Sequence, residues 1–232
     1  METELRLPEI RKEVHDRIGE LMLAHGYKLN KSDSSFKKKI DSNLIQLSID
    51  YYDFFPSSYQ IRFRYQFVNS YVQEIKKQFF EDYLSLEYLK LWDHIVYEGV
   101  YQDEIKNEEY KAKVAFKHDL ITHADLDNAL WQMRNKISNH LLINDNYYVT
   151  VPGLNYLLNT EYEMLINFFE PEAILTSVIV ARLMQSPIYE ELNSYLDFEL
   201  QNLSKKGEFF GRVFNLRRKL YDFMKVYQIR DL

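Results

Sequence analysis

A chain of 232 residues, 46% of them hydrophobic, is long enough to bury a substantial core. It contains no cysteine, which excludes disulfides and thiolate metal sites, and its net charge of -6 disfavours nucleic acid or an anionic membrane as a partner. The first residues lack the apolar core of a secretion signal, and the most apolar run, 174–184, is too short to span a bilayer. These features predict a soluble, cytoplasmic protein.

The chain opens with an amphipathic helix. Pro8 suits a first helical turn, and Gly26 suits the position just beyond a helix end. Between them, apolar residues recur at helical spacing: Ile10, Val14, Ile18, Leu21 and Met22. We therefore expect a helix from Pro8 to His25.

After Gly26 the hydrophobic period changes to two, which predicts strands at 35–40, 44–52 and 58–68. Consecutive strands favour a meander. Matching the apolar faces sets Phe36 against Ile49 and Ile49 against Phe63, and it leaves Lys38 on the apolar face, as suits an edge strand.

Helices dominate the rest of the chain. We expect a helix from about residue 69, and residues 109–116 allow a fourth strand. Thr122 and Asp125 form a capping box ahead of an apolar stripe that leaves Trp131 outside it: Leu126, Leu130, Met133, Ile137 and Leu141. After a turn at Pro152-Gly153, further helices are expected to begin near Thr160, Pro171 and Pro187, with a last one over 208–228.

The predicted fold class is therefore α+β, in a single domain over residues 1–232. Residues 1–118 form the N-terminal helix and an antiparallel β-meander of three to four strands. This part packs with a mostly helical second half over residues 119–232. Run 174–184 is apolar nearly all round, so we expect its helix to be central.

Cations gather on the polar side of the predicted sheet: Lys37, Lys39, Arg62 and Arg64, opposed mainly by Asp50. Two interpretations stand side by side. These side chains could bind an anionic partner, or they could cover a solvated sheet face, as long cationic side chains commonly do. Only Tyr52 offers a ring on which a base could stack, so we do not expect nucleic acid there.

The last helix has a basic side with Arg212, Arg217, Arg218, Lys219 and Lys225. A solvated helix face is the simpler interpretation. A partner's acidic surface could also use it.

A short motif, "MRNKISNH", places His140 six residues after Arg134. Arg, a polar residue, a few more residues and then His resembles the signature of the HEPN ribonuclease superfamily. The resemblance implies metal-independent RNA cleavage, usually at a dimer interface, with His140 as acid and base and Arg134 steadying the phosphate. On one continuous α-helix the two positions lie about 120° apart, so they converge only if the helix ends between them or two subunits contribute. A surface arginine and a structural histidine are the alternative.

We expect neither a metal nor a cofactor. The stretch "HDLITHAD" holds His118, Asp119, His123 and Asp125, but its spacing matches no metal motif, and Asp125 is already used by the capping box. No glycine pattern follows a strand to cradle a nucleotide.

The order of helix, "GYKLNK", meander and helices around "VPGLNYLLN" resembles uncharacterised bacterial α+β proteins that carry a domain of unknown function. The resemblance implies a fold and no activity. We predict a binding or interaction protein without catalytic activity, which contacts another protein through its sheet face or its helices. The alternative is a ribonuclease that uses Arg134 and His140. A homodimer is left open, and a membrane is not expected.

Overall fold

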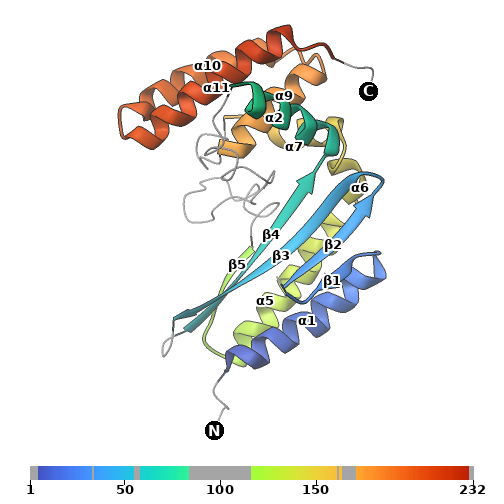
Figure 1. Cartoon of the computed structure of the whole chain (residues 1–232). Helices are drawn as coiled ribbons and strands as arrows, with labels where there is room; N and C mark the ends of the chain where they lie inside the picture. Colours follow the sequence, from blue (N-terminus) through green and yellow to red (C-terminus); the bar gives the residue numbers. More distant parts are fainter. Residues whose placement is uncertain are drawn as a thin grey trace. The chain divides into compact units, whose positions relative to one another are not determined.

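The computed structural model of the chain describes residues 5–32, 34–54, 58–83, 116–160, 162–163 and 171–229 (Figure 1). The α+β prediction is confirmed: an N-terminal helix, an antiparallel sheet and a mostly helical C-terminal half follow one another. The chain divides into two compact units, residues 1–66 with 97–146 and residues 67–96 with 147–232. The single domain stays a prediction. Among the described helices, none is both long and apolar enough to cross a membrane.

The first unit contains a five-stranded sheet whose strands follow one another in chain order, which confirms the meander (Figure 1). Its strands are β1 (Lys28–Asn30), β2 (Ser35–Ile40), β3 (Asn43–Phe54), β4 (Ser58–Val68) and β5 (Phe116–Leu120). The predicted fourth strand over 109–116 lies outside the described residues except for Phe116, where β5 begins and pairs with Phe63. Strand β1, only three residues long, was not predicted.

The register between β2 and β3 differs from the prediction by two residues. Phe36 pairs with Leu47, not with Ile49, and Ile40 pairs with Asn43. The turn consists of Asp41 and Ser42, with Asp41 at φ +53, a left-handed conformation that aspartate tolerates. Because the shift is an even number, every side chain keeps its predicted face, and Phe36 and Leu47 are both buried.

Helix α1 (Leu7–Ala24) covers the apolar face of this sheet. Its buried residues include the predicted Ile10, Val14, Ile18 and Met22, and Gly26 follows the helix end at φ +83. Three contacts fix the helix against three strands. The His15 ring meets the Phe36 ring at 6.4 Å between centroids, the Arg11 guanidinium lies 5.2 Å from the Tyr51 ring centroid, and the Tyr65 hydroxyl donates to the Met22 sulfur at 3.9 Å.

Helix α5 (His123–Lys136) begins at the predicted capping box. The Thr122 amide donates to Asp125 Oδ2 at 2.8 Å, and the Asp125 amide donates to Thr122 Oγ1 at 3.2 Å. The predicted apolar stripe is buried, while Trp131 is 63% exposed. At its C-terminal end the helix widens into a π-helical turn, η2 (Ile137–Leu141), where the Leu142 amide donates to the Ile137 carbonyl at 2.9 Å.

A buried ion pair explains why a lysine occupies the apolar side of the sheet. Lys38 Nζ lies 2.9 Å from Asp145 Oδ2, and the Tyr27 hydroxyl donates to the same oxygen at 3.0 Å. The edge-strand explanation was wrong, because β1 pairs with β2 and lies outside it. Lys38 is accommodated because a carboxylate on a later segment meets it.

Apart from the last two residues of β4, the regular elements described in the second unit are helices, and α9 (Pro171–Leu183) is the central one. As predicted, α9 is buried on nearly all sides, including two polar residues, Thr176 and Ser177. The other helices described in this unit are α2 (Ser70–Tyr83), α7 (Val151–Asn159), α10 (Tyr189–Ser204) and α11 (Glu208–Val226), and α6 (Asp145–Tyr148) runs into it from the first unit.

The predicted turn at Pro152-Gly153 was wrong. Both residues lie in the first turn of α7, where the Gly153 amide donates to the Oγ1 of Thr150 at 3.2 Å. Proline suits this position because its missing N–H would have no helical partner there. The helix expected near Thr160 falls mostly outside the described residues.

Candidate functional site

Arg134 lies on the exposed side of α5, with its Nη1 3.9 Å from Glu20 Oε2 on α1. His140 belongs to the π-helical turn η2, and its side chain lies outside the described part of the structure. The helix does not end between the two residues. Six residues of an α-helix rotate by about 600° around the helix axis, and a π-helical turn rotates less per residue. The rotation from Arg134 to His140 is therefore close to one and a half turns. One chain thus places the two backbone positions near opposite sides of the helix, and the ribonuclease prediction now depends on two subunits.

On the polar side of the sheet, Lys37 is half-buried and Lys39 is exposed. The side chains of Arg62 and Arg64 lie outside what the structure describes. The strand register adds two lysines that sequence analysis missed. Lys28 on β1 pairs with Lys37, and Lys117 on β5 pairs with Arg62. A three-residue strand has no readable period, which is why Lys28 escaped notice.

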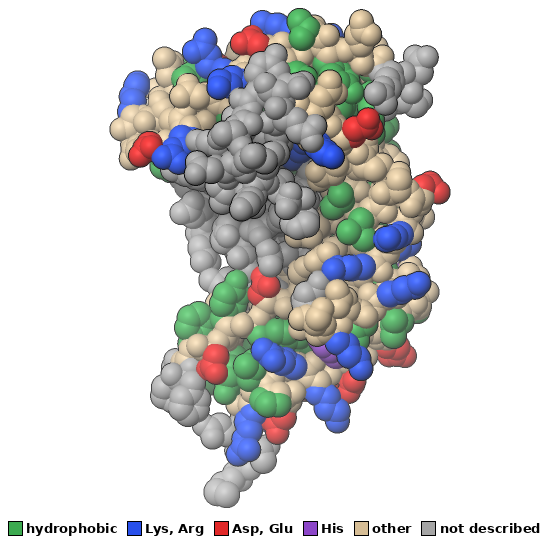
Figure 2. Space-filling model, in the orientation of Figure 1, with side chains coloured by type: hydrophobic (Ala, Val, Ile, Leu, Met, Phe, Trp, Pro, Cys, Tyr) green, Lys and Arg blue, Asp and Glu red, His purple; other side chains and the backbone are tan. Residues whose placement is uncertain are grey.

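Part of this polar side is not accessible to solvent, because Ser35 and Ser48, which pair with one another across β2 and β3, are both buried. In the face that Figure 2 shows, a few lysine and arginine side chains lie close together at the middle right, and the others are interspersed with carboxylates. Anion binding by Lys37, Lys39, Arg62 and Arg64 therefore stays a prediction. The described residues offer a better-defined site in the second unit.

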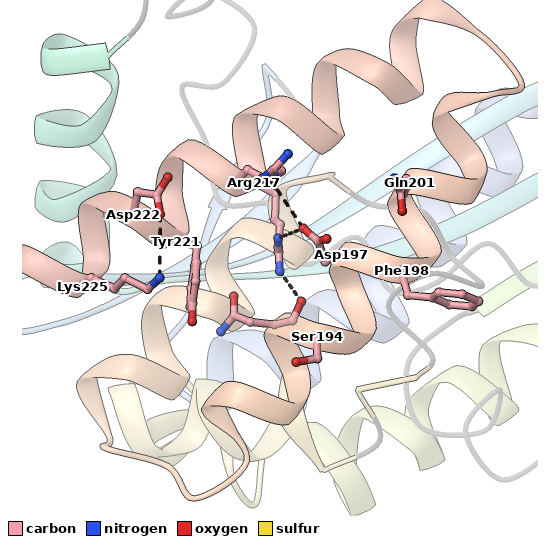
Figure 3. Close-up of a pocket in the computed structure, with 10 residues that line it drawn as sticks. Ser194, Asp197, Phe198, Gln201, Arg217, Tyr221, Asp222 and Lys225 are labelled. Carbon is pink, nitrogen blue, oxygen red and sulfur yellow. Dashed lines mark hydrogen bonds and ion pairs between the residues drawn. The ribbon is translucent and has the colours of Figure 1, made fainter.

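A groove of about 510 Å³ runs between α10 and α11 (Figure 3). The lining residues recur every three or four positions, so each helix contributes one stripe. Helix α10 supplies Asn193, Ser194, Asp197, Phe198 and Gln201, and α11 supplies Arg217, Arg218, Tyr221, Asp222 and Lys225.

Arg217 is the centre of the groove and is only 2% exposed, so its predicted place on a solvated basic face was wrong. Its Nη1 donates to Asp197 Oδ1 at 2.7 Å, and its Nη2 donates to the Asn193 carbonyl (Figure 3). Its buried Nε has no hydrogen-bond partner among the described residues. Burial lowers the pKa of the Arg217 guanidinium, and the Asp197 carboxylate opposes that shift.

Tyr221 lies between two cations. The Lys225 ammonium is 4.0 Å from its ring centroid, and the Arg217 guanidinium carbon is 5.7 Å from the same point. The Tyr221 hydroxyl donates to Glu190 Oε2 at 2.7 Å, and this hydrogen bond raises the pKa of Tyr221 to about 12. The ring is therefore held as a fixed wall of the groove.

Arg218 and Lys225 stand at the exposed rim of the groove. Arg218 Nε is 3.8 Å from Asp197 Oδ1, and Lys225 Nζ is 3.9 Å from Asp222 Oδ1. The Arg218 and Lys225 side chains are 62% and 52% exposed. Exposed ion pairs at such distances contribute little, about 0–1 kcal/mol, so an incoming carboxylate could replace either at small cost.

The lining residues are mostly charged or polar. Three cations face two carboxylates, Asp197 and Asp222, and the remaining polar groups are amides and hydroxyls. The one aliphatic hydroxyl, that of Ser194, donates to the Glu190 carbonyl at 2.9 Å. None of the ten lining residues is a histidine or cysteine that could act as base or nucleophile.

Comparison of the chain with protein-family models, with curated proteins and with solved structures gave no match. Neither resemblance noted from the sequence gains support from them.

Proposed function

We propose that the protein is a cytoplasmic binding protein without catalytic activity that holds an acidic segment of another protein in the α10–α11 groove. The observation that supports this most is the pair of exposed cations, Arg218 and Lys225, above the buried guanidinium of Arg217. The groove has one more cation than carboxylates, so an anionic segment is the complementary ligand.

The spacing of these cations suggests the form of the ligand. Arg218 and Lys225 are seven residues apart on α11, which corresponds to about 10.5 Å along the axis and the same side of the helix. A helix that lies along the groove presents two carboxylates at the same spacing when they are also seven residues apart. Phe198, 62% exposed on the α10 wall, offers this helix an apolar contact.

The test uses two alanine-rich helical peptides of equal composition. The first carries two glutamates seven residues apart, and the second carries them five residues apart, on different sides of the helix. Fluorescence anisotropy measures their dissociation constants with the whole protein. We expect the first peptide to bind at least about tenfold more tightly, and its affinity to fall as salt rises from low to physiological concentration.

The protein variants distinguish binding in the groove from a general effect of the protein's charge. Arg218→Glu with Lys225→Glu is expected to weaken binding of the first peptide at least about tenfold. Lys206→Glu with Lys219→Glu is the matched control, because it reverses the same number of charges and both lysines are exposed and do not line the groove. Equal affinities of the double variant and the wild type, or an equal loss in the control, would contradict the proposal.

The metal-independent ribonuclease stays as a second candidate because of one observation. The helix that carries Arg134 widens into a π-helical turn at His140, and such turns recur at functional sites. Incubation of mixed RNA with the wild type and with His140→Ala tests it. Cleavage that is absent from both, or equal in both, removes this candidate.

A further inference from the structure

The exposed side of α5 in the first unit carries an aromatic residue that the core does not use. Trp131 is 63% exposed, while the opposite stripe of the helix, with Leu126, Leu130 and Met133, is buried. Tryptophan and arginine are the residues most enriched at the energetic centres of protein interfaces. Trp131 and Arg134 are neighbours on one helical stripe that also includes Asp127.

The charged residues around Trp131 form a surface that is complementary to a second copy of the same surface. Asp127 precedes it by four residues and Arg134 follows it by three, so Trp131 lies near the midpoint of an opposite-charge pair. Helix α1 lies beside α5 (Figure 1) and carries the opposite order of charges, since Arg17 pairs with Asp127 and Glu20 with Arg134. The surface thus holds two cations and two carboxylates.

We propose that this surface, made of Arg17, Glu20, Asp127, Trp131 and Arg134, is an interface with a second copy of this chain. A two-fold axis at Trp131 runs the two α5 helices antiparallel and packs the indole rings together. Asp127 of each chain then faces Arg134 of the other, as an interface between identical surfaces requires. Because the five residues of this surface sum to zero charge, the surface adds no local repulsion to that from the net charge of -6 on each copy.

The intramolecular ion pairs do not prevent this exchange. The side chains of Asp127 and Glu20 are 70% and 77% exposed, and those of Arg17 and Arg134 are 37% and 50% exposed. Pairs this exposed hold their partners weakly. They gain strength when a second copy excludes water from them, because the local dielectric constant falls. The interface is independent of the α10–α11 groove, which belongs to the other unit.

Sedimentation equilibrium of the whole protein tests the proposal. The wild type is expected to dimerise at micromolar concentration, and Trp131→Ala to raise the dissociation constant by about 30-fold or more. Tyr156→Ala is the control, because Tyr156 is also an exposed aromatic residue, 53% exposed, but lies on α7. A wild type that stays monomeric at about 200 μM, or a control that dissociates equally, overturns the proposal.

Exchanging the charges of Asp127 and Arg134 distinguishes the loss of a direct contact across the interface from damage to the fold. Asp127→Arg sets arginine against arginine across the two-fold axis, and Arg134→Asp sets aspartate against aspartate. Each is expected to weaken the dimer at least about tenfold, and the double variant is expected to recover most of the wild-type affinity. A double variant no better than the single ones refutes the proposed pairing, provided that circular dichroism shows all variants folded.

Discussion

Replacing Lys38 by methionine leaves the Asp145 carboxylate buried without a counter-charge. In the folded chain the Asp145 side chain is 3% exposed, and its Oδ2 accepts from Lys38 Nζ at 2.9 Å and from the Tyr27 hydroxyl at 3.0 Å. Methionine keeps most of the aliphatic stem, so packing against Ile45, the cross-strand partner of Lys38, changes little. The substitution removes the ammonium group, and with it the ion pair to Asp145 and the contact with the Tyr27 ring, whose centroid lies 5.5 Å from Lys38 Nζ.

The expected cost follows from the burial of the two partners. Breaking one side of a fully buried pair costs about 3–5 kcal/mol. The Lys38 side chain is 20% exposed, so water reaches one end of the site, and we expect a loss of about 2–4 kcal/mol. Asp145→Asn is expected to cost less, because the lysine can extend toward solvent whereas the aspartate cannot.

Urea unfolding at neutral pH measures these losses, and the double variant Lys38→Met with Asp145→Asn completes a thermodynamic cycle. We expect the double variant to be more stable than the sum of the single losses predicts, with a coupling of about 1–3 kcal/mol. A Lys38→Met loss below about 1 kcal/mol, or purely additive losses, would refute the view that this ion pair holds the lysine on the apolar face.

The remaining predictions concern single positions. Gly19→Ala is expected to stabilise the protein by about 0.5–1 kcal/mol, because its Cβ meets the Phe36 ring at an ordinary 3.5 Å within α1. Gly153→Ala is expected to destabilise it by about 2 kcal/mol or more, because the Cβ overlaps the Tyr147 carbonyl, and thermal melts that rank the two variants in the opposite order would contradict both. Burial lowers the pKa of His15 below 6.5, so the unfolded chain binds a proton more readily than the folded one, and stability should fall as pH drops through about 6.5. His15→Phe should flatten this part of the profile of unfolding free energy against pH, and an unchanged slope would show that another group is responsible.

The local elements of the fold could be read from the sequence because their causes are local. The capping box at Thr122 and the positive φ of Gly26 involve neighbours in the chain, and the period-two pattern of β3 and β4 is a property of the strands themselves. The register of β2 against β3 was predicted two residues away from the observed one, because a shift of two residues leaves the alternation of faces unchanged.

The candidate groove could be anticipated only in part. The basic stripe of α11 was visible, and contact with an acidic partner was one of its interpretations. The α10 wall was not visible, because Asp197 and Phe198 look like any polar and apolar pair on a helix until α11 lies beside them. Trp131 was recognised as lying outside the core stripe, but the ion pairs that α1 contributes around it come from residues more than 100 positions away.

Sequence alone therefore determined the kind of element at most described positions and the side of each element that faces the core, since both depend on spacing along the chain. Only the tertiary structure decided which charges are buried and what they meet. Lys38 became one half of a buried ion pair because Asp145 reaches it, and Arg217 became the centre of a groove because Asp197 and the Asn193 carbonyl lie within its reach. The physical reason is that the energy of a charge depends on its solvation and its neighbours in space, and neither is set by its neighbours in sequence.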